Sequence, residues 1–587
     1  MQNSSQFQSI PRSGPGLFWL LSHIAIPTVI LFGTVYAFAL TFVYIEGDDA
    51  SSVVYHAMGR NRALQPPYSA YHGMMDIFLG LLPSNEVIVR HTAMAMTAIA
   101  AALMVILIGI LIFSWLPFES GWRISACMIL LLICSPEIFY MGLVYTPSLV
   151  AMSLVLAAHV MIRSSCLRKF RSELDESRSA TIFLLSAVLF GVGVACRWDV
   201  GVYLLFVAAD LLLIRRPAGG SRAGWRISAA WCSAAFAASL AAILVSGHGI
   251  VDIRSTLELA KKEVSSSDSW FATIGAYQTL FTPGFGAFFL IGVVFLFRKS
   301  RRSLLLIAVG VLSVAPYFFS REPKMILPAL PALWLAVAAG INVIFQMPRD
   351  KFRWAMPILI LLSLTPWVIG LRVNSAETAW GPGFEVKTGD RSAAANTSTI
   401  LTNRVDERTV GVGKIRLGPT GGFAIPTPEG PRPLGGHFWV LFGGKWRELA
   451  SELAAERERV VAVSTEKRYN ILQDSGNSYI VAELLEKGYM TTNEKGTHAG
   501  NGVYGRVFTS SAGPPLTLQT LQVRKRLFEK TQLAELQKLN PVGKVMLYSG
   551  YTSTITKIAE VAPDSLEILG PFSAIVDITA LNAEIHE

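Results

Sequence analysis

Long apolar stretches dominate the first 371 of the 587 residues and limit what this part of the chain can become. A helix that crosses the roughly 30 Å hydrocarbon core of a membrane needs about 17 to 25 mainly apolar residues. The sequence predicts about eleven such spans, several of them short. They cover residues 17–45, 87–113, 124–140, 146–162, 180–196, 200–214, 227–246, 282–297, 303–319, 325–345 and 354–371. We therefore expect a polytopic α-helical membrane protein.

The composition supports this expectation and divides the chain into two units. Hydrophobic residues make up 52% of the chain, charged residues only 16%, and the mean hydropathy is +0.45, which is too apolar for a soluble protein of this length. The apolar residues are concentrated before Leu371, and the remainder has an ordinary globular composition. We predict a transmembrane domain over residues 1–371 and a soluble domain over residues 372–587.

The C-terminal region alternates strand-like and helix-like segments, which predicts an α/β or α+β domain. The expected strands are 438–442, 460–464, 503–509, 545–549 and 575–578, and the expected helices are 445–456, 479–487 and 552–561. The region contains no glycine-rich phosphate loop and no nucleophile elbow. We expect it to bind an acceptor or to have a structural role.

Basic residues predict the orientation of the spans, because Lys and Arg in short loops are retained on the cytoplasmic side. Alternate loops are basic, at residues 163–178, 215–226, 298–302 and 349–353. The N-terminus is then cytoplasmic, while the loop after the first span and the C-terminal domain are extracytoplasmic. The net charge of +10 arises in the membrane half, so it does not indicate a nucleic-acid partner.

Three carboxylates follow the first predicted span, in the segment Glu46-Gly47-Asp48-Asp49. Acidic groups next to hydrocarbon are costly unless they meet a cation, a metal or a reacting hydroxyl. We predict that the outer loop 46–86 is catalytic. The alternative is a solvated cap at the start of a short helix. Such an oxygen-rich group can also hold Mg²⁺ or Mn²⁺, and the sequence leaves metal dependence open.

Aromatic residues follow a pair of prolines later in the same loop, at Tyr68, Tyr71 and His72. Paired prolines favour an extended backbone, and aromatic rings can stack on the face of a sugar. The alternative is an anchor at the membrane interface.

These features together resemble the GT-C superfamily of polyprenyl-phosphate-sugar glycosyltransferases, in particular its protein mannosyltransferase and aminoarabinose lipid A transferase branch. The resemblance covers residues 17–371. It rests on an N-in first span, an acidic pair at its outer end, the Pro66-Pro67-Tyr68 segment before a span that opens with Arg90, and the Arg-Glu-Pro-Lys-Met-Ile-Leu-Pro-Ala-Leu-Pro run that begins at Arg321. The turn Ala195-Cys196-Arg197-Trp198-Asp199 is similar to a short outer turn of that family that carries a basic residue.

The resemblance implies a bacterial inner-membrane enzyme with a periplasmic C-terminal domain. It would move a sugar from a polyprenyl phosphate to a glycan, lipid or protein acceptor. Such a reaction needs a general base and cations for the departing phosphate. Asp48 or Asp49 would be the base, and Glu46 is a weaker choice. Tyr68, Tyr71 and His72 would bind the acceptor or the sugar. Because one carboxylate would act as the base while the donor leaves as a phosphate, a single displacement with inversion at the anomeric carbon is favoured.

Arg197, Arg321 and Lys324 are the candidate phosphate ligands, because all three lie at predicted outer turns. Each has an alternative interpretation. Arg321 and Lys324 can snorkel to lipid headgroups, and Arg197 can form a structural pair with Asp199.

The main competing functions are a transporter or flippase and a non-catalytic scaffold of envelope glycan assembly. Transporters commonly carry ionisable residues near the bilayer midplane. Here the charges are predicted at span ends, with Asp210 close to the cytoplasmic Arg215. For His159, which is predicted to lie near the inner face, a structural role is favoured over a ligand role.

Overall fold

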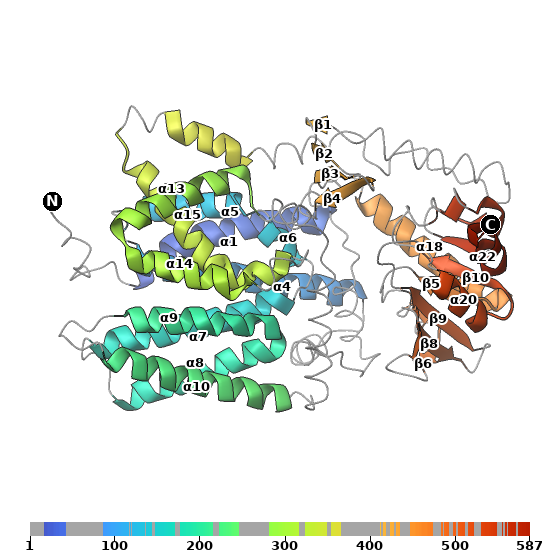
Figure 1. The fold of residues 1–587 in the computed structure, drawn as a ribbon, viewed down its shortest axis with the longest axis horizontal. Coiled ribbons are helices and arrows are strands. Elements are labelled where there is room, and N and C mark those ends of the chain that lie inside the picture. The colour runs from blue at the N-terminus through green and yellow to red at the C-terminus, as the bar shows by residue number, and fades with distance from the viewer. Residues whose placement is uncertain are drawn as a thin grey trace.

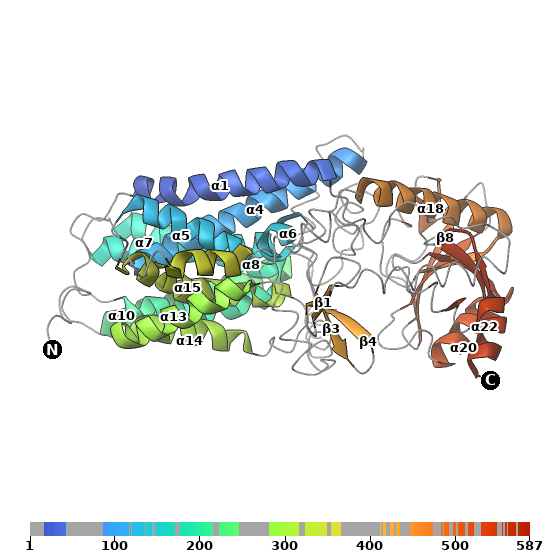
Figure 2. The same ribbon diagram turned by 90° about the horizontal axis from the view of Figure 1, so that it is seen from above.

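The computed structural model has a helical part and a C-terminal sheet domain at opposite ends of its long axis (Figures 1 and 2). It describes residues 17–42, 86–116, 118, 120–135, 137–143, 147–170, 176–214, 222–245, 281–315, 323–348, 354–364, 411–412, 415–417, 423–427, 430–434, 446–473, 480, 483–484, 487–491, 497–500, 503–510, 515–521, 530–548, 555, 558–559, 562–570 and 573–586.

Each span that the sequence predicts contains at least one helical segment among the described residues. The elements are α1 (Leu17–Phe42), α4 (Glu86–Trp115), α5 (Gly121–Ile133), α6 (Glu137–Leu143), α7 (Pro147–Phe170), α8 (Glu176–Cys196), η1 (Trp198–Val202), α9 (Tyr203–Leu213), α10 (Arg222–Val245), α13 (Pro283–Lys299), α14 (Arg301–Ser313), η3 (Pro323–Ala329), α15 (Leu330–Phe345) and a helix over Trp354–Leu364. The predicted span 124–140 is two helices, α5 and α6. Pro136 lies between them in the sequence and has no N–H for a helical hydrogen bond.

Among the described residues, six helices are long and apolar enough to cross a membrane. The corresponding stretches are Phe18–Tyr36, Ala95–Trp115, Pro147–Leu167, Ser177–Cys196, Trp225–Val245 and Met325–Phe345. The chain is therefore a multi-pass membrane protein, while a total of about eleven crossings stays a prediction.

Helix α15 is the centre of the bundle. Its span is 89% buried within the protein, whereas that of α1 is 22% buried and faces outward. Glycines allow α13 to approach α15 closely: a Cβ on Gly292 would lie 1.8 Å from the carbonyl oxygen of Ala336, and one on Gly340 would lie 2.0 Å from that of Phe288. Small residues at helix contacts are how membrane helices bring their backbones together.

The C-terminal domain contains a mixed sheet flanked by helices, which confirms the expected mixed class. Its strands are β5 (Asn470–Gln473), β6 (Met490–Thr491), β7 (Thr497–Gly500), β8 (Val503–Thr509), β9 (Leu516–Leu521), β10 (Lys544–Tyr548), β11 (Leu566–Ile568) and β12 (Ser573–Asp577). The order is β11-β12-β10-β5-β9-β8-β6, with β7 also paired to β8. The central pairs β10–β5 and β5–β9 are parallel, and the outer pairs are antiparallel.

The helical elements of this domain are α18 (Trp446–Lys467), α20 (Lys530–Leu539), η5 (Pro563–Ser565) and α22 (Ile578–His586). The strand predicted at 460–464 is wrong, because these residues continue α18 and bury Val460 and Val461. The strand expected at 438–442 lies outside the described residues. A separate antiparallel sheet consists of β1 (Gly411–Val412), β2 (Ile415–Leu417), β3 (Phe423–Thr427) and β4 (Gly430–Leu434).

The buried carboxylate of Glu456 on α18 forms hydrogen bonds that connect this helix to the turn between β11 and β12. Glu456 accepts hydrogen bonds from the Ser573 hydroxyl and, at 2.6 Å, from Arg459. The same Arg459 nitrogen donates to the Leu569 carbonyl at 2.8 Å. Burial raises the pKa of Glu456, because its charged form loses hydration.

Candidate functional site

The predicted catalytic loop and its three carboxylates lie outside the described residues. This applies to Glu46, Asp48 and Asp49. The same holds for the candidate sugar or acceptor ligands Tyr68, Tyr71 and His72, and for the phosphate candidate Arg321. In the sequence, these residues fall between the described helices α1, which ends at Phe42, and α4, which begins at Glu86. The roles assigned to these residues stay predictions.

Arg197, the phosphate candidate whose side chain is described, occupies a sharp turn between α8 and α9. Its backbone is extended (φ −162°, ψ 119°), which stops α8 at Cys196 and lets the chain reverse into the short helix η1. The side chain is buried, and Nε donates to Asp199 Oδ1 at 2.6 Å. The ion pair that the alternative interpretation predicts is therefore present.

Two of the predicted cationic turns meet in the structure. Nη2 of Arg197 donates to the Sδ of Met325 at 3.4 Å, and Met325 belongs to η3, the helix that also contains Lys324. The η1 turn thus contacts the start of the Leu-Pro-Ala-Leu-Pro span, although more than 120 residues separate them in the sequence. The side chain of Lys324 lies outside the description.

Two buried polar atoms beside Arg197 have no hydrogen-bond partner among the described residues. They are the indole nitrogen Nε1 of Trp198 and the second carboxylate oxygen, Oδ2, of Asp199. A buried polar group that lacks a partner carries a desolvation cost, so such atoms indicate a place where a ligand or a neighbouring segment completes the hydrogen bonds. One atom donates and the other accepts.

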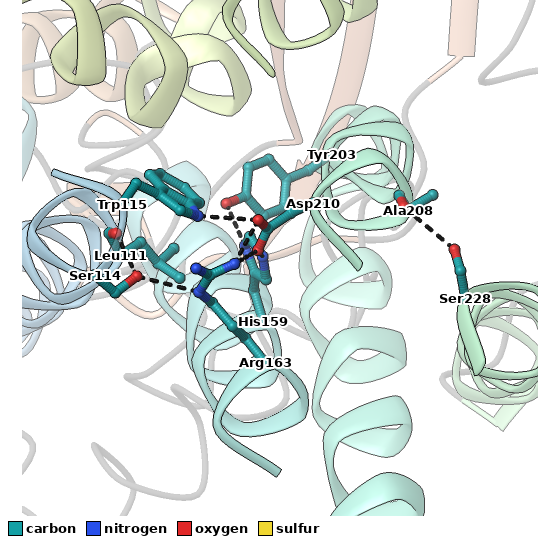
Figure 3. Close-up of polar contacts among 9 residues, drawn as sticks. All are labelled: Leu111, Ser114, Trp115, His159, Arg163, Tyr203, Ala208, Asp210 and Ser228. Carbon is teal, nitrogen blue, oxygen red and sulfur yellow. Dashed lines mark hydrogen bonds and ion pairs between the residues drawn. The ribbon is translucent and has the colours of Figure 1, made fainter. Parts of the chain in front are cut away.

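A second group of polar side chains lies deeper in the bundle, on α4, α7 and α9 (Figure 3). The carboxylate of Asp210 accepts from His159 Nε2 at 2.9 Å, from Trp115 Nε1 at 2.9 Å, and from Arg163 Nη1 at 2.5 Å. Nδ1 of His159 lies 2.8 Å from the hydroxyl of Tyr203. We call these five residues the α9 anchor.

The anchor is buried and well satisfied. His159 and Tyr203 are fully buried, and Asp210 is 2% exposed. Arg163 additionally donates through Nε to the Ser114 hydroxyl at 3.1 Å and lies over the Trp115 ring at 5.3 Å. Charges inside a membrane bundle are tolerated when they pair in this way.

This group of side chains was not predicted from the sequence. Arg163 was expected in a cytoplasmic loop, but α7 continues to Phe170 and the Arg163 side chain bonds to Asp210. Arg215, which the sequence places close to Asp210, lies outside the described residues. His159, for which a structural role was favoured, is hydrogen-bonded at both ring nitrogens. The available signal was the spacing of His159 and Arg163, four residues apart and hence on one helix face.

A metal centre is not found in the described part of the chain, where no group of three or more His, Cys, Asp or Glu residues could hold an ion. The acids proposed for Mg²⁺ or Mn²⁺ belong to the loop outside that part. Metal dependence therefore stays open.

Comparison with known proteins places the fold. No protein-family model and no curated protein matches the chain. Among solved structures, it is similar to ArnT from Cupriavidus metallidurans bound to undecaprenyl phosphate, with a TM-score of 0.52 and 14% identity over 94% of this chain and 97% of that chain. The chain has a GT-C-like fold. ArnT in the apo state is similar at a TM-score of 0.45 and 13% identity, over 95% of this chain and 98% of that one.

The GT-C-like fold confirms the resemblance seen in the sequence and extends it. The sequence indicated a likeness over residues 17–371, whereas the structural match covers 94% of the chain and so continues well beyond the membrane part. At 14% identity, the match describes the fold rather than the activity.

Proposed function

We propose that this protein is a membrane glycosyltransferase that moves a sugar from a polyprenyl-phosphate donor to an extracytoplasmic glycan, lipid or protein. The observation that carries the proposal is the GT-C-like fold, shared over 94% of the chain with ArnT bound to undecaprenyl phosphate. The contact between the η1 and η3 turns supports it independently, because it unites two segments selected from the sequence as phosphate ligands.

The donor phosphate would bind at these turns. Arg197, Arg321 and Lys324 would neutralise the phosphate, which becomes the leaving group of the reaction. Nε1 of Trp198 would donate to a phosphate oxygen, and Oδ2 of Asp199 would accept from a sugar hydroxyl. Both atoms are buried beside Arg197, so water would compete poorly with the lipid.

The transfer would proceed by a single displacement. The acceptor oxygen forms a bond to the anomeric carbon, the bond from that carbon to the phosphate oxygen breaks, and the electron pair leaves with the polyprenyl phosphate. Asp48 or Asp49 would take the acceptor proton, and Glu46 is the weaker candidate. Tyr68, Tyr71 and His72 would hold the acceptor or the sugar. The product would have inverted stereochemistry.

The orientation follows from the basic loops. The N-terminus would be cytoplasmic, and the loop 46–86 and the domain over 372–587 would be periplasmic in a bacterial inner membrane. A divalent Mg²⁺ or Mn²⁺ ion, if one binds, would be held by Glu46, Asp48 and Asp49.

The test is incubation of the purified protein with a panel of polyprenyl-phosphate sugars and candidate acceptors, followed by mass spectrometry. We expect one sugar to appear on an acceptor while free polyprenyl phosphate accumulates in equal amount. Movement of a lipid-linked sugar across vesicles without its consumption would instead indicate a flippase. Absence of both would leave a scaffold role and contradict the proposal.

A further inference from the structure

Helix α9 is directly continuous with the η1 turn. The N–H of Tyr203 bonds to the carbonyls of Val200 and Gly201, so this residue ends η1 and begins α9. The position of α9 along its own axis therefore determines where η1 lies, and with it the side chains of Arg197 and Asp199.

The α9 anchor holds this helix in one arrangement. Asp210 accepts hydrogen bonds from α7, through His159 and Arg163, and from α4, through Trp115. The hydroxyl of Tyr203 meets the other nitrogen of the same imidazole (Figure 3). On the opposite side, Ser228 of α10 donates to the backbone oxygen of Ala208 at 3.2 Å.

A shift of α9 would break several of these bonds at once. One residue of slip moves a helix by about 1.5 Å and turns it by about 100°. Such a slip would take the Asp210 carboxylate away from three donors and leave a charge buried in the bundle, which is strongly unfavourable. The anchor thus excludes neighbouring registers.

His159 has a defined role in this arrangement. An ionised carboxylate only accepts hydrogen bonds, so Nε2 of His159 donates to Asp210. In the neutral ring Nδ1 then accepts from the Tyr203 hydroxyl. One imidazole therefore connects two points of α9 that are seven residues, or about two helical turns, apart.

We infer that His159, Tyr203 and Asp210 are positioning residues that fix α9, and through it the η1 turn, in the geometry that binds the phosphate of a polyprenyl lipid. None of them touches the lipid. The inference rests on the proposed function, because it assigns the anchor to the same phosphate site.

The sharpest variant is Tyr203→Phe, which removes one hydroxyl from the anchor and keeps the ring that packs against Phe206. The matched control is Ser125→Ala. It removes one hydroxyl from a hydrogen bond between α5 and α1, where Ser125 donates to the His23 carbonyl at 2.9 Å. Melting temperature and monodispersity in detergent establish that both variants fold.

Two measurements follow on the full-length protein. Hydrogen exchange measures how often the amides of η1 open. Equilibrium binding of undecaprenyl phosphate measures the affinity of the proposed phosphate site. In Tyr203→Phe we expect faster exchange of the amides of residues 198–203. We also expect binding of undecaprenyl phosphate to weaken by about 2- to 10-fold, the range set by one lost hydrogen bond. Ser125→Ala should change neither quantity.

A double-mutant cycle tests whether the anchor acts through η1. In an Arg197→Ala background, Tyr203→Phe should cost less affinity than it costs in the wild type, because one of the ligands that it positions is absent. Full additivity of the two effects would overturn the inference. Unchanged η1 exchange in Tyr203→Phe, or an equal loss of affinity in Ser125→Ala, would also overturn it.

The wild-type protein separates this inference from the proposed function. If the wild type does not bind undecaprenyl phosphate, the proposed function fails before any variant is compared, and the inference falls with it. If the wild type binds but Tyr203→Phe leaves η1 exchange unchanged, or loses no more affinity than Ser125→Ala, only the positioning role fails.

Discussion

Arg197 donates to Asp199 on its own turn and to Met325 on the turn before α15, so one guanidinium joins two turns that are far apart in the chain. If Arg197 only stabilised its own turn, its hydrogen bond to Asp199 would be sufficient. The contact with η3 brings the Arg197 side chain next to the backbone that also carries Lys324.

Arg197→Ala and Lys324→Ala should each weaken use of the lipid-linked donor. A charge-assisted hydrogen bond to phosphate contributes about 1.5 to 3 kcal/mol, so catalytic efficiency should fall by about 10- to 150-fold. Steady-state kinetics at varied donor concentration measure this. Arg226→Ala, which removes an exposed charge at the predicted cytoplasmic end of α10, is the control. If Arg197→Ala lowers the melting temperature while donor kinetics stay unchanged, Arg197 is only a structural partner of Asp199.

Asp48→Asn and Asp49→Asn should differ in severity, because adjacent side chains point in different directions. The variant that lacks the general base should bind donor but lose transfer by about 10²- to 10⁴-fold. Single-turnover transfer and donor binding, measured on the same preparations, separate the two steps. Transfer at the parental rate in both variants would return the carboxylates to a helix-capping role.

Gly340→Ala should destabilise the bundle, since its new Cβ would lie 2.0 Å from the Phe288 carbonyl oxygen. Backbone atoms cannot move aside cheaply, and overpacking of this kind costs about 1–3 kcal/mol. Thermal unfolding in detergent measures the loss. Gly286→Ala on α13 is the matched control, because a Cβ there would meet nothing within 4 Å. Equal melting temperatures for the two variants would show that α13 and α15 do not pack as closely as described.

Glu456→Gln should stabilise the C-terminal domain, and the gain should depend on pH. Burial raises the pKa of Glu456 above its usual value of 4.5, so the folded state holds the proton more tightly than the unfolded state does. This contribution to stability is complete below the unfolded pKa and is lost as the pH rises through the folded pKa. A neutral amide escapes that loss.

The corresponding measurement is the difference in melting temperature between Glu456→Gln and wild type at pH 5 and at pH 8, on the full chain. The advantage of the variant should be larger at pH 8. Glu567→Gln, at an exposed position of β11, serves as the control. An advantage of the same size at both pH values would mean that the Glu456 charge is not the cause.

Apolar length predicted most of the membrane part, because a span is a local property of the sequence. The segment 180–196 agrees with α8, and 325–345 agrees with η3 and α15 together. Local pattern failed where tertiary packing decides. Val460 and Val461 favour a strand by their branched side chains, yet they form the buried face of α18, which packs on the sheet.

For the candidate site, the sequence indicated single segments but not the distant contacts that they make. Arg197 and the η3 segment were selected because turns and basic residues can be read locally, and the structure brings them into contact. The partners of Asp210 could not be found in this way, since His159 and Arg163 come from another helix some 50 residues earlier. Arg215, only five residues from Asp210 in the sequence, lies outside the described residues.

The position of β5 between two parallel neighbours constrains the order in which the C-terminal domain can fold during synthesis. Both of its neighbours in the sheet, β9 and β10, are synthesised after it, and β10 follows β9 in the chain. Until β10 emerges, β5 has an open edge that can pair with other chains. If this domain is exported as predicted, its central sheet closes only after β10 has been translocated. Truncations that remove β10 should therefore yield aggregated protein rather than a shortened folded one.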